Sequence, residues 1–294
     1  MTATATGFDE KIHRFSRMLN RADCILIGAG SGLSVDAGLD YFDKALFAKR
    51  YPAMLQYGYT ISAQLMVFST SAPELYWGYY LAHAKNMRFG EPYKTVYSRL
   101  LDIVGAQQDY FVITTNVDAL FVRNGFSDNR IYTPQGDYAL MQCRRPCRDD
   151  TWPSGPIIDR LLPTVDPLTQ KLPKALVPVC PNCGGPVFFN LRGGNWFVDA
   201  PYTAQRRRYQ TWIERNQKRR ILLIEIGTGF NTPVWIRWPF EELTLQNPNA
   251  NLVRINLEES DIPENIRKRS LGFSNRAIDV VSAVWNHLKI KEVW

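Results

Sequence analysis

The stretch CILIGAGSGLSVDAG, residues 24–38, decides the fold class. It begins as an unbroken apolar run and passes directly into glycines, a pattern typical of a buried parallel strand that ends in a tight loop. The runs YFVITTNVD and ILLIEIGTG likewise end in turns that carry Asn, Asp or Gly. Continuous apolar strands alternating with helical patterns predict an α/β fold, in which helices cover both faces of a parallel sheet. Ligands of such sheets bind outside the carboxyl ends of the strands.

The composition is that of an ordinary globular protein. The 294 residues are 45% hydrophobic and 21% charged, enough for one large domain that carries a smaller one. The first residues, MTATATGFDEKIHRF, lack the apolar run of a signal peptide, and no stretch approaches the ~18 apolar residues of a membrane span. We therefore expect a cytoplasmic protein with no membrane partner, whose cysteines are thiols or metal ligands rather than disulfides.

The positive charge is concentrated in one segment. The net charge is +7, and the run QRRRYQTWIERNQKRR, residues 205–220, alone holds seven basic residues and one acid. A basic helix with two aromatic residues can bind nucleic acid or an acidic partner. It can also be a solvated helix face that braces the next strand. We favour bracing, and nucleic acid is an unlikely partner, because the sequence has no second basic patch.

Four of the five cysteines form two close pairs. Cys143 and Cys147 are separated by three residues, and Cys180 and Cys183 by two, the second pair within VCPNCGG. This spacing predicts a tetrahedral zinc site made of four thiolates, with glycines that let backbone NH groups approach sulfur. Because four thiolates leave the metal no open position, we expect structural Zn2+. The fifth cysteine, Cys24, lies in the first strand and reads as a small core residue.

The glycine loop after the first strand does not identify a cofactor by itself. Gly28, Gly30, Gly32 and Gly38 would let the backbone approach a pyrophosphate, but their spacing is not G-x-G-x-x-G. A dehydrogenase would show a second strand with an acid about 20 residues on. That interval reads DYFDKALFAKRYPAML, which looks helical, so an ordinary NAD oxidoreductase is disfavoured.

The order of the motifs narrows the interpretation. The first strand ends in GAG and the second in TTNVD; QGD, the four-cysteine module, IGTG and RIN then follow in sequence. This series resembles the sirtuin family along the whole chain, and the combination is far more specific than any one motif. The resemblance implies a Rossmann-like domain, NAD+ as co-substrate, a zinc-bearing small domain, and activity as a deacylase or an ADP-ribosyltransferase.

Two segments without clear sheet patterning look like insertions that build the small domain. Residues 45–88 read as several short helices, and residues 137–192 are dense in Pro and Cys and poor in periodicity. The predicted boundaries are 1–43, 93–137 and 196–294 for the Rossmann-like domain, 44–92 for a helical insertion and 138–195 for a zinc-binding module.

The chain departs from most sirtuins at one position that matters for chemistry. Gln135 stands where most members carry a histidine general base, and His13, His83 and His287 lie away from the strand-end motifs. The glycine loop is longer than usual, and the arginine that usually follows the Asp-Phe pair is missing from LDYFD. These features look most like the class M sirtuins (SirTM) of microbial pathogens. That resemblance implies an ADP-ribosyltransferase linked to a macrodomain hydrolase, with a lipoylated glycine-cleavage-H-like carrier as the acceptor protein.

Gln135 limits the chemistry that the site can perform. Breaking the nicotinamide–ribose bond needs orientation and charge stabilisation but no base, because nicotinamide leaves as a neutral molecule. Deacylation must also remove a proton from a ribose hydroxyl, which Gln135 can hydrogen-bond but cannot deprotonate. We therefore expect Gln135, Asn116 and Asp118 to hold the ribose and carboxamide. The alternatives are helix capping by Asn116 and Asp118 and a turn role for Gln135.

Further site residues follow from the motif series. Phe42 lies where the family often caps nicotinamide, and Arg192 faces the phosphates or the acceptor in this interpretation. Asp40, Asp43 and Asp137 are candidates for a base if the acceptor needs one. The predicted catalytic residues are Asn116, Gln135 and Asp118, and the predicted cofactor-binding residues are Gly28, Ala29, Gly30, Ser31, Asp40, Phe42, Asn116, Asp118, Gln135, Gly227, Thr228 and Asn256.

Three functions fit the sequence. The leading hypothesis is an NAD-dependent protein mono-ADP-ribosyltransferase of the sirtuin fold. The second is a lysine deacylase whose base is not histidine, and the third is a pseudo-sirtuin that binds NAD+ or ADP-ribose as a sensor or scaffold. Nicotinamide release separates the last from the others, because a sensor binds NAD+ without consuming it.

Overall fold

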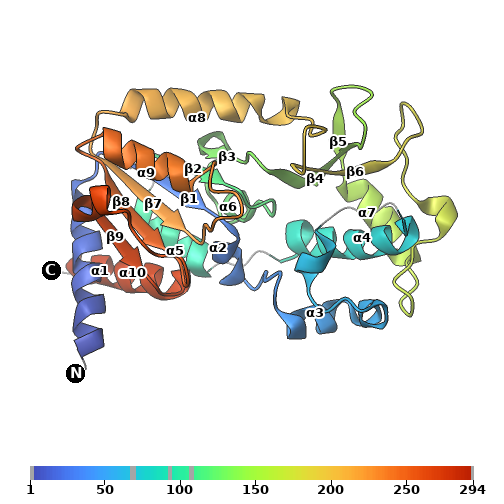
Figure 1. The fold of residues 1–294 in the computed structure, drawn as a ribbon, viewed down its shortest axis with the longest axis horizontal. Helices are drawn as coiled ribbons and strands as arrows, with labels where there is room; N and C mark the ends of the chain where they lie inside the picture. Colours follow the sequence, from blue (N-terminus) through green and yellow to red (C-terminus); the bar gives the residue numbers. More distant parts are fainter. Residues whose placement is uncertain (1–2, 67–70, 92–94, 106–108, 293–294) are drawn as a thin grey trace.

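The main sheet has the strand order of a dinucleotide-binding fold. The computed structural model describes residues 3–66, 71–91, 95–105 and 109–292 (Figure 1). The strands of this sheet are β1 (Cys24–Ala29), β2 (Asp109–Thr114), β3 (Ile131–Tyr132), β7 (Ile221–Ile226), β8 (Asn251–Ile255) and β9 (Ser270–Phe273). Their order is β3-β2-β1-β7-β8-β9, and all neighbours run parallel. This is the 3-2-1-4-5-6 order of a Rossmann sheet, whose order reverses between β1 and β7. The predicted fold class is confirmed.

Helices cover both faces of this sheet. Along β1, Ile25 and Ile27 join one hydrophobic cluster while Cys24 and Leu26 join another, because successive side chains of a strand point to opposite faces. The first face is covered by α1 (Ala3–Arg21), α5 (Thr95–Val104) and α10 (Ala277–Glu292), and the second by α8 (Thr203–Asn216) and α9 (Arg237–Gln246) (Figure 1). Burial on both faces explains the unbroken apolar runs. Cys24 is fully buried there, as predicted.

A second, antiparallel sheet lies beside the first (Figure 1). It has the order β5 (Thr151–Pro153), β4 (Gly136–Cys143) and β6 (Val187–Leu191), and α4 (Pro73–Phe89) packs against α7 (Gly155–Leu161) and β4. The elements outside the main sheet and its covering helices are α2 (Ser31–Val35), α3 (Lys44–Arg50), α4 (Pro73–Phe89), α6 (Leu120–Arg123), β4 (Gly136–Cys143), β5 (Thr151–Pro153), α7 (Gly155–Leu161) and β6 (Val187–Leu191), with 3-10 turns at Pro52–Tyr57, Ser62–Leu65, Asp128–Arg130, Leu162–Thr164, Lys174–Leu176, Ala200–Tyr202 and Glu264–Arg269.

This second sheet differs from the expectation for residues 137–192. The sequence there shows little periodicity, yet β4 and β6 pair over most of their length, with a register shift between Asp137 and Met141. Phe188 and Phe189 are both buried although they point to opposite faces of β6, so no alternating pattern marks the strand. The domain boundaries given from the sequence stay predictions.

The basic segment is fixed to the protein's own acids. Asp109, at the start of β2, accepts hydrogen bonds from Trp212 Nε1 at 2.7 Å and Arg215 Nη2 at 2.8 Å. Arg219 also reaches Asp109, and Arg220 binds Asp23. The end of the basic segment is therefore anchored at the amino ends of β1 and β2, which supports bracing over nucleic-acid binding.

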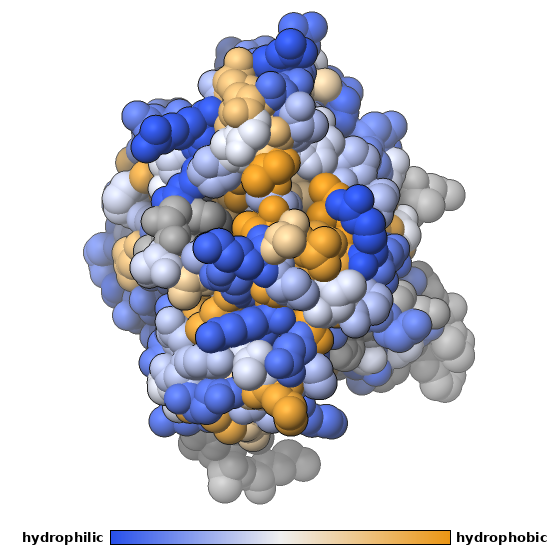
Figure 2. All heavy atoms as spheres, turned by 90° about the vertical axis from the view of Figure 1, so that its right-hand side faces the viewer, coloured by the Kyte–Doolittle hydropathy of each residue, from blue (hydrophilic) through white to orange (hydrophobic). Residues whose placement is uncertain are grey.

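The end of the molecule away from the main sheet exposes hydrophobic side chains. Figure 2 faces this end, and hydrophobic residues gather at its centre. Between α7 and β6, Leu168, Leu176 and Val179 are exposed hydrophobic residues. Among the helices described, none combines the length and the apolar character needed to cross a membrane.

Candidate active site

The crevice at the strand-order reversal is built by glycines from two loops. A Cβ on Gly30 would lie 2.5 Å from the carbonyl oxygen of Gly227, and one on Gly32 would lie 2.6 Å from the Gly227 Cα. Gly227 itself has φ of +61°, in the left-handed region that favours glycine. The loops after β1 and β7 therefore touch backbone to backbone, which requires glycine before any ligand is considered. Gly28 is different, since its missing side chain would meet Ile236 and Phe240 of the covering layer.

A cavity of about 400 Å³ opens at this crevice. It lies at the carboxyl ends of β1, β7 and β8, where a nucleotide binds in such sheets. Four predicted cofactor-binding residues line it: Ser31, Phe42, Gly227 and Asn256. A larger hollow of about 1060 Å³ lies elsewhere, and none of the predicted site residues is among those lining it.

Asn116 and Asp118 follow β2 and lie beside the glycine loop. Asn116 donates its amide Nδ2 to the carbonyl oxygen of Gly30 at 2.9 Å, so its side chain crosses to the neighbouring loop. Asp118 accepts from the Ser34 hydroxyl at 2.7 Å and from the backbone NH of Leu120 at 2.9 Å. The second contact is a local turn contact just before α6, whose N-cap residue is Ala119 and which has no side-chain cap. Burial raises the pKa of this carboxyl above its usual value.

Gln135 occupies a turn whose shape is fixed from both sides. Gly136 has φ of +101°, and a Cβ there would lie 2.0 Å from the carbonyl oxygen of Asn190. Arg192 donates its backbone NH to the Gln135 carbonyl at 2.9 Å and its Nε to the Pro134 carbonyl at 2.7 Å. The turn is therefore fastened to β6 by short backbone contacts.

Arg192 is held by its own chain. Besides Pro134, its guanidinium binds Asp199 at 2.6 Å and stacks over the rings of Phe197 and Trp235. Arg192 thus supports the turn that carries Gln135, while its predicted contact with phosphate or acceptor stays a prediction.

The carboxylates considered as bases are engaged with neighbours. Asp137 forms an ion pair with Arg88 at 2.7 Å. Asp40 accepts a hydrogen bond from the backbone NH of Phe42, and Asp43 caps α3 through Leu46. Each therefore has a structural role that explains its presence.

Thr228 and Asn256 shape the loops around the cavity. The Thr228 hydroxyl donates to buried Glu225. Asn256 donates Nδ2 to the Thr228 carbonyl at 2.7 Å, and its Oδ1 accepts from the NH groups of Glu258 and Glu259 at 3.0 Å. These contacts join the β7 loop to the β8 loop. Whether either residue also contacts a cofactor stays a prediction.

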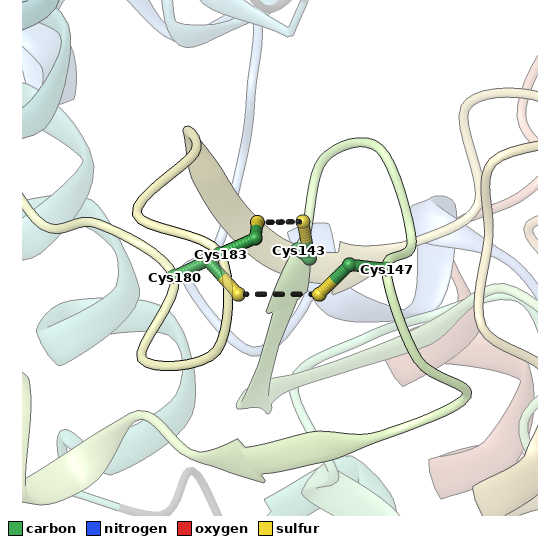
Figure 3. A group of neighbouring side chains, drawn as sticks. All are labelled: Cys143, Cys147, Cys180 and Cys183. Carbon is green, nitrogen blue, oxygen red and sulfur yellow. Dashed lines mark hydrogen bonds between the residues drawn. The ribbon is translucent and has the colours of Figure 1, made fainter.

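The four predicted metal ligands converge (Figure 3). Cys143 and Cys183 sulfurs lie 3.7 Å apart, as do those of Cys147 and Cys180, and all four lie within 4.8 Å of one another. A disulfide needs sulfurs at about 2.05 Å, whereas a tetrahedron with Zn–S of about 2.3 Å has edges of about 3.8 Å. A Cβ on Gly185 would lie 3.2 Å from the Cys183 sulfur, so glycine keeps this sulfur uncrowded. The cluster fits structural zinc.

The structure places His83 close to the Gln135 turn, which the sequence did not predict. Its ring, on α4, lies 5.5 Å from that of Tyr138, and its Nδ1 lies 3.1 Å from the Tyr79 hydroxyl. Burial lowers the pKa of His83 to about 3, so the ring is neutral at physiological pH. An enclosed, weakly basic imidazole cannot replace the missing histidine base.

A buried charge cluster beneath the cavity was also missed by sequence reasoning. Glu225, Arg254 and Arg237 are buried between β7, β8 and α9. The signal was present, because Glu225 interrupts the apolar run ILLIEI and a charge in a buried strand needs partners.

Comparisons with known proteins agree with this architecture. No protein-family model matches the chain. The chain is 35% identical over 246 residues to a Fusarium oxysporum f. sp. cubense protein named "Probable bifunctional ADP-ribose hydrolase/ADP-ribosyltransferase", covering 81% of this chain and 41% of that protein. It is 28% identical over 256 residues to a Staphylococcus aureus strain Mu50 protein named "Protein ADP-ribosyltransferase", covering 86% of this chain and 80% of that protein. The chain thus spans about two fifths of the fungal relative's length.

Solved structures share this fold. A solved structure of a mutant Sir2 homologue with ADP-ribose has a TM-score of 0.60 and 14% identity, covering 95% of this chain and 97% of that one. A Rossmann-like sheet with a crevice at its order reversal, joined to a smaller unit with a four-cysteine cluster, is the sirtuin architecture. The protein is therefore a sirtuin by fold, and its resemblance to the sirtuin family is confirmed, while the likeness to class M sirtuins stays a prediction.

Proposed function

We propose that this protein is an NAD-dependent protein mono-ADP-ribosyltransferase. The observation that carries the proposal is Gln135, which stands in the motif series where most sirtuins have a histidine base and lies in a turn fastened to β6. The two relatives named for ADP-ribosyltransferase activity support it, as does the structural neighbour in complex with ADP-ribose. NAD+ supplies the ADP-ribosyl group that is transferred, with nicotinamide as the leaving molecule.

The residues present suit the first step of this reaction. The cavity loops carrying Ser31, Gly227 and Asn256 would hold the dinucleotide, while Asn116 and Gln135 would orient its ribose and carboxamide. The Asn116 amide is fixed by its contact with the Gly30 carbonyl, so it supplies a dipole without needing to reorganise as charge develops. Buried Asp118, whose pKa is raised, would complete the nicotinamide end of the site.

The same residues argue against deacylation. Gln135 cannot accept a proton, His83 is enclosed, and Asp137 is paired with Arg88. A positioned base is typically worth about 10²–10⁴ in rate, so a site without one deacylates weakly. The deacylase with another base and the non-catalytic NAD+ sensor remain the alternative functions.

The acceptor is proposed from resemblance. The likeness to class M sirtuins favours a lipoylated glycine-cleavage-H-like carrier protein. The fungal relative's name joins ADP-ribose hydrolase to ADP-ribosyltransferase in one protein, which supports a macrodomain hydrolase as functional partner.

The test compares label transfer from radiolabelled NAD+ to lipoylated and unlipoylated carrier protein. Asn116→Ala and Gln135→Ala should each reduce labelling about 10²-fold or more, because in this proposal each variant loses an amide that orients the reacting ribose. Gln210→Ala, an exposed glutamine on α8, is the matched control and should label as wild type does.

The outcomes separate the three functions. Label on the lipoylated carrier alone supports the full proposal, and equal label on both forms supports transfer without lipoyl recognition. Efficient lysine deacylation with no labelling would indicate the deacylase. Tight NAD+ binding without nicotinamide release would indicate the sensor.

A further inference from the structure

Four charged side chains form a cluster between the main sheet and α9. Glu225 comes from β7, Arg254 from β8, and Arg237 and Glu241 from α9. The side chains of Arg254, Glu225 and Arg237 are at most 4% exposed, and that of Glu241 is 24% exposed. Two positive and two negative charges balance, which is the condition under which buried charges persist.

The contacts within the cluster are short. Arg254 binds Glu225 Oε2 through Nη2 at 2.8 Å and Nε at 3.0 Å, and Glu241 through Nη2 at 2.6 Å. Arg237 lies 3.7 Å from Glu225 and 3.9 Å from Glu241. Arg254 and Glu225 thus form the centre of the cluster, and Arg237 is attached to it at longer range.

Arg237 connects this cluster to two walls of the 400 Å³ cavity. Its Nη1 donates to the backbone carbonyl of Glu259 at 3.0 Å, and its guanidinium stacks on the Phe230 ring with 4.2 Å to the centroid. Phe230 lies in the loop after β7, and Glu259 follows β8. Both line the cavity, whereas Arg237 does not. One guanidinium therefore ties two loops from different strands to the same buried charges.

Stability alone does not account for these charges. A buried ion pair is often no more stabilising than well-packed apolar side chains of similar volume. A guanidinium, however, can donate to a carbonyl at its edge while its plane stacks on a ring, which an ammonium group cannot do. Arg237 makes both contacts at once, to the Glu259 carbonyl and to the Phe230 ring.

We infer that Arg237 is a positioning residue for NAD+ binding: it sets the separation of the Phe230 and Glu259 walls without touching the dinucleotide. This inference rests on the proposed function, since it assumes that NAD+ occupies the cavity. Loss of the brace should weaken dinucleotide binding and leave the chemistry at Asn116 and Gln135 unchanged. The signature is a rise in KM for NAD+ at constant kcat.

The experiment measures nicotinamide release and NAD+ binding by calorimetry for wild type, Arg237→Lys and Glu241→Gln. Arg237→Lys keeps the charge but loses the planar stack, and should raise KM and Kd for NAD+ about tenfold with kcat within about twofold. Glu241 is partly exposed and its carboxylate faces both arginines. Glu241→Gln removes this charge and should raise KM and Kd for NAD+ about threefold. Arg215→Lys, an exposed arginine on α8, is the control and should behave as wild type.

Thermal unfolding shows which variants are folded. If Arg237→Lys does not fold, the KM and Kd of Glu241→Gln test the positioning role of Arg237. Folded variants with unchanged KM, or with reduced kcat at unchanged KM, would overturn the inference while leaving the proposed function standing. A wild-type protein that binds no NAD+ would contradict the proposed function itself, and the inference with it.

Discussion

Gly227 combines two requirements at one residue. Its φ of +61° is strained for other residues, and a Cβ would lie 2.5 Å from the Cα of Gly32. The motif IGTG is thus explained by contact between two loops as well as by access for a ligand. Gly58 has a similar φ of +82°, but a Cβ there would meet nothing within 4 Å, so this glycine isolates the cost of backbone strain.

Gly227→Ala should lower the free energy of unfolding by about 3 kcal/mol or more, because strain and backbone overlap act together. Gly58→Ala should cost only about 1 kcal/mol, since strain acts alone. Urea denaturation of both variants measures the difference. An equal loss of unfolding free energy in the two variants would show that the loops after β1 and β7 can separate at no cost. The contact between Gly32 and Gly227 would then not hold the crevice together.

At the scale of elements, His83 joins α4 to its surroundings through a cluster of aromatic residues. Its Nδ1 lies within hydrogen-bonding distance of the hydroxyls of Tyr51 and Tyr79, and its ring contacts those of Tyr41 and Tyr138. Tyr138 belongs to β4, directly after the Gln135 turn. The cluster therefore fastens the helical segment to the strand that positions the site, provided that the imidazole stays neutral.

This neutrality predicts a pH dependence of stability. The folded pKa of about 3 lies below the unfolded value of 6.5, so the unfolded state takes up the proton first as pH falls. The stability is complete above pH 6.5 and is lost as pH falls toward 3. Between pH 7 and pH 4, wild type should lose on the order of 3 kcal/mol more than His83→Gln, which cannot titrate there.

Urea denaturation across this pH range provides the measurement. Gln210→Ala, at the exposed glutamine of α8, is the control and should follow wild type. A His83→Gln protein with the same pH dependence as wild type would show that His83 is not the group responsible.

The sequence predicts those elements whose pattern is local. The strands β1, β2, β7 and β8 are apolar runs buried on both faces, and α1, α5 and α10 carry apolar residues at helical spacing. The strand β4 was not predicted, because its partner β6 lies more than forty residues away and register is set by that distant pairing. The helix α4 has buried residues on all sides, so its 3.6-residue period is obscured.

The candidate site divides in the same way. The motifs that carry Asn116, Gln135 and Gly227 could be grouped from the sequence because the carboxyl ends of parallel strands meet at one edge of a sheet, and the roles of these residues stay predictions. The cysteines were predictable because metal ligands come at characteristic spacings. The support given by Arg192 to the Gln135 turn, and by Arg237 to the cavity walls, depends on partners distant in sequence. No local pattern encodes such contacts.

For the molecule as a whole, the two parts of the site have different foundations. The cavity is built by loops of the main sheet. The turn carrying Gln135 is instead fastened to the second sheet, since Gly136 begins β4 and Arg192 follows β6. The cysteine cluster lies in that second unit, with Cys143 at the end of β4. Zinc should therefore matter for the turn and much less for the cavity.

Removing zinc tests this division. Chelation should release about one Zn2+ per chain, measured with a colorimetric metal indicator, and should loosen the second sheet because the four thiolates lose their common ligand. We expect ADP-ribose transfer to be lost while Kd for NAD+ stays within about threefold.

Cys183→Ser should reproduce both effects without chelator, whereas Cys24→Ser, at the fully buried cysteine of β1, should retain the metal. Transfer that survives complete zinc release would mean that the Gln135 turn is held by the main sheet alone, and an equal loss of NAD+ binding would mean that the two units fold as one.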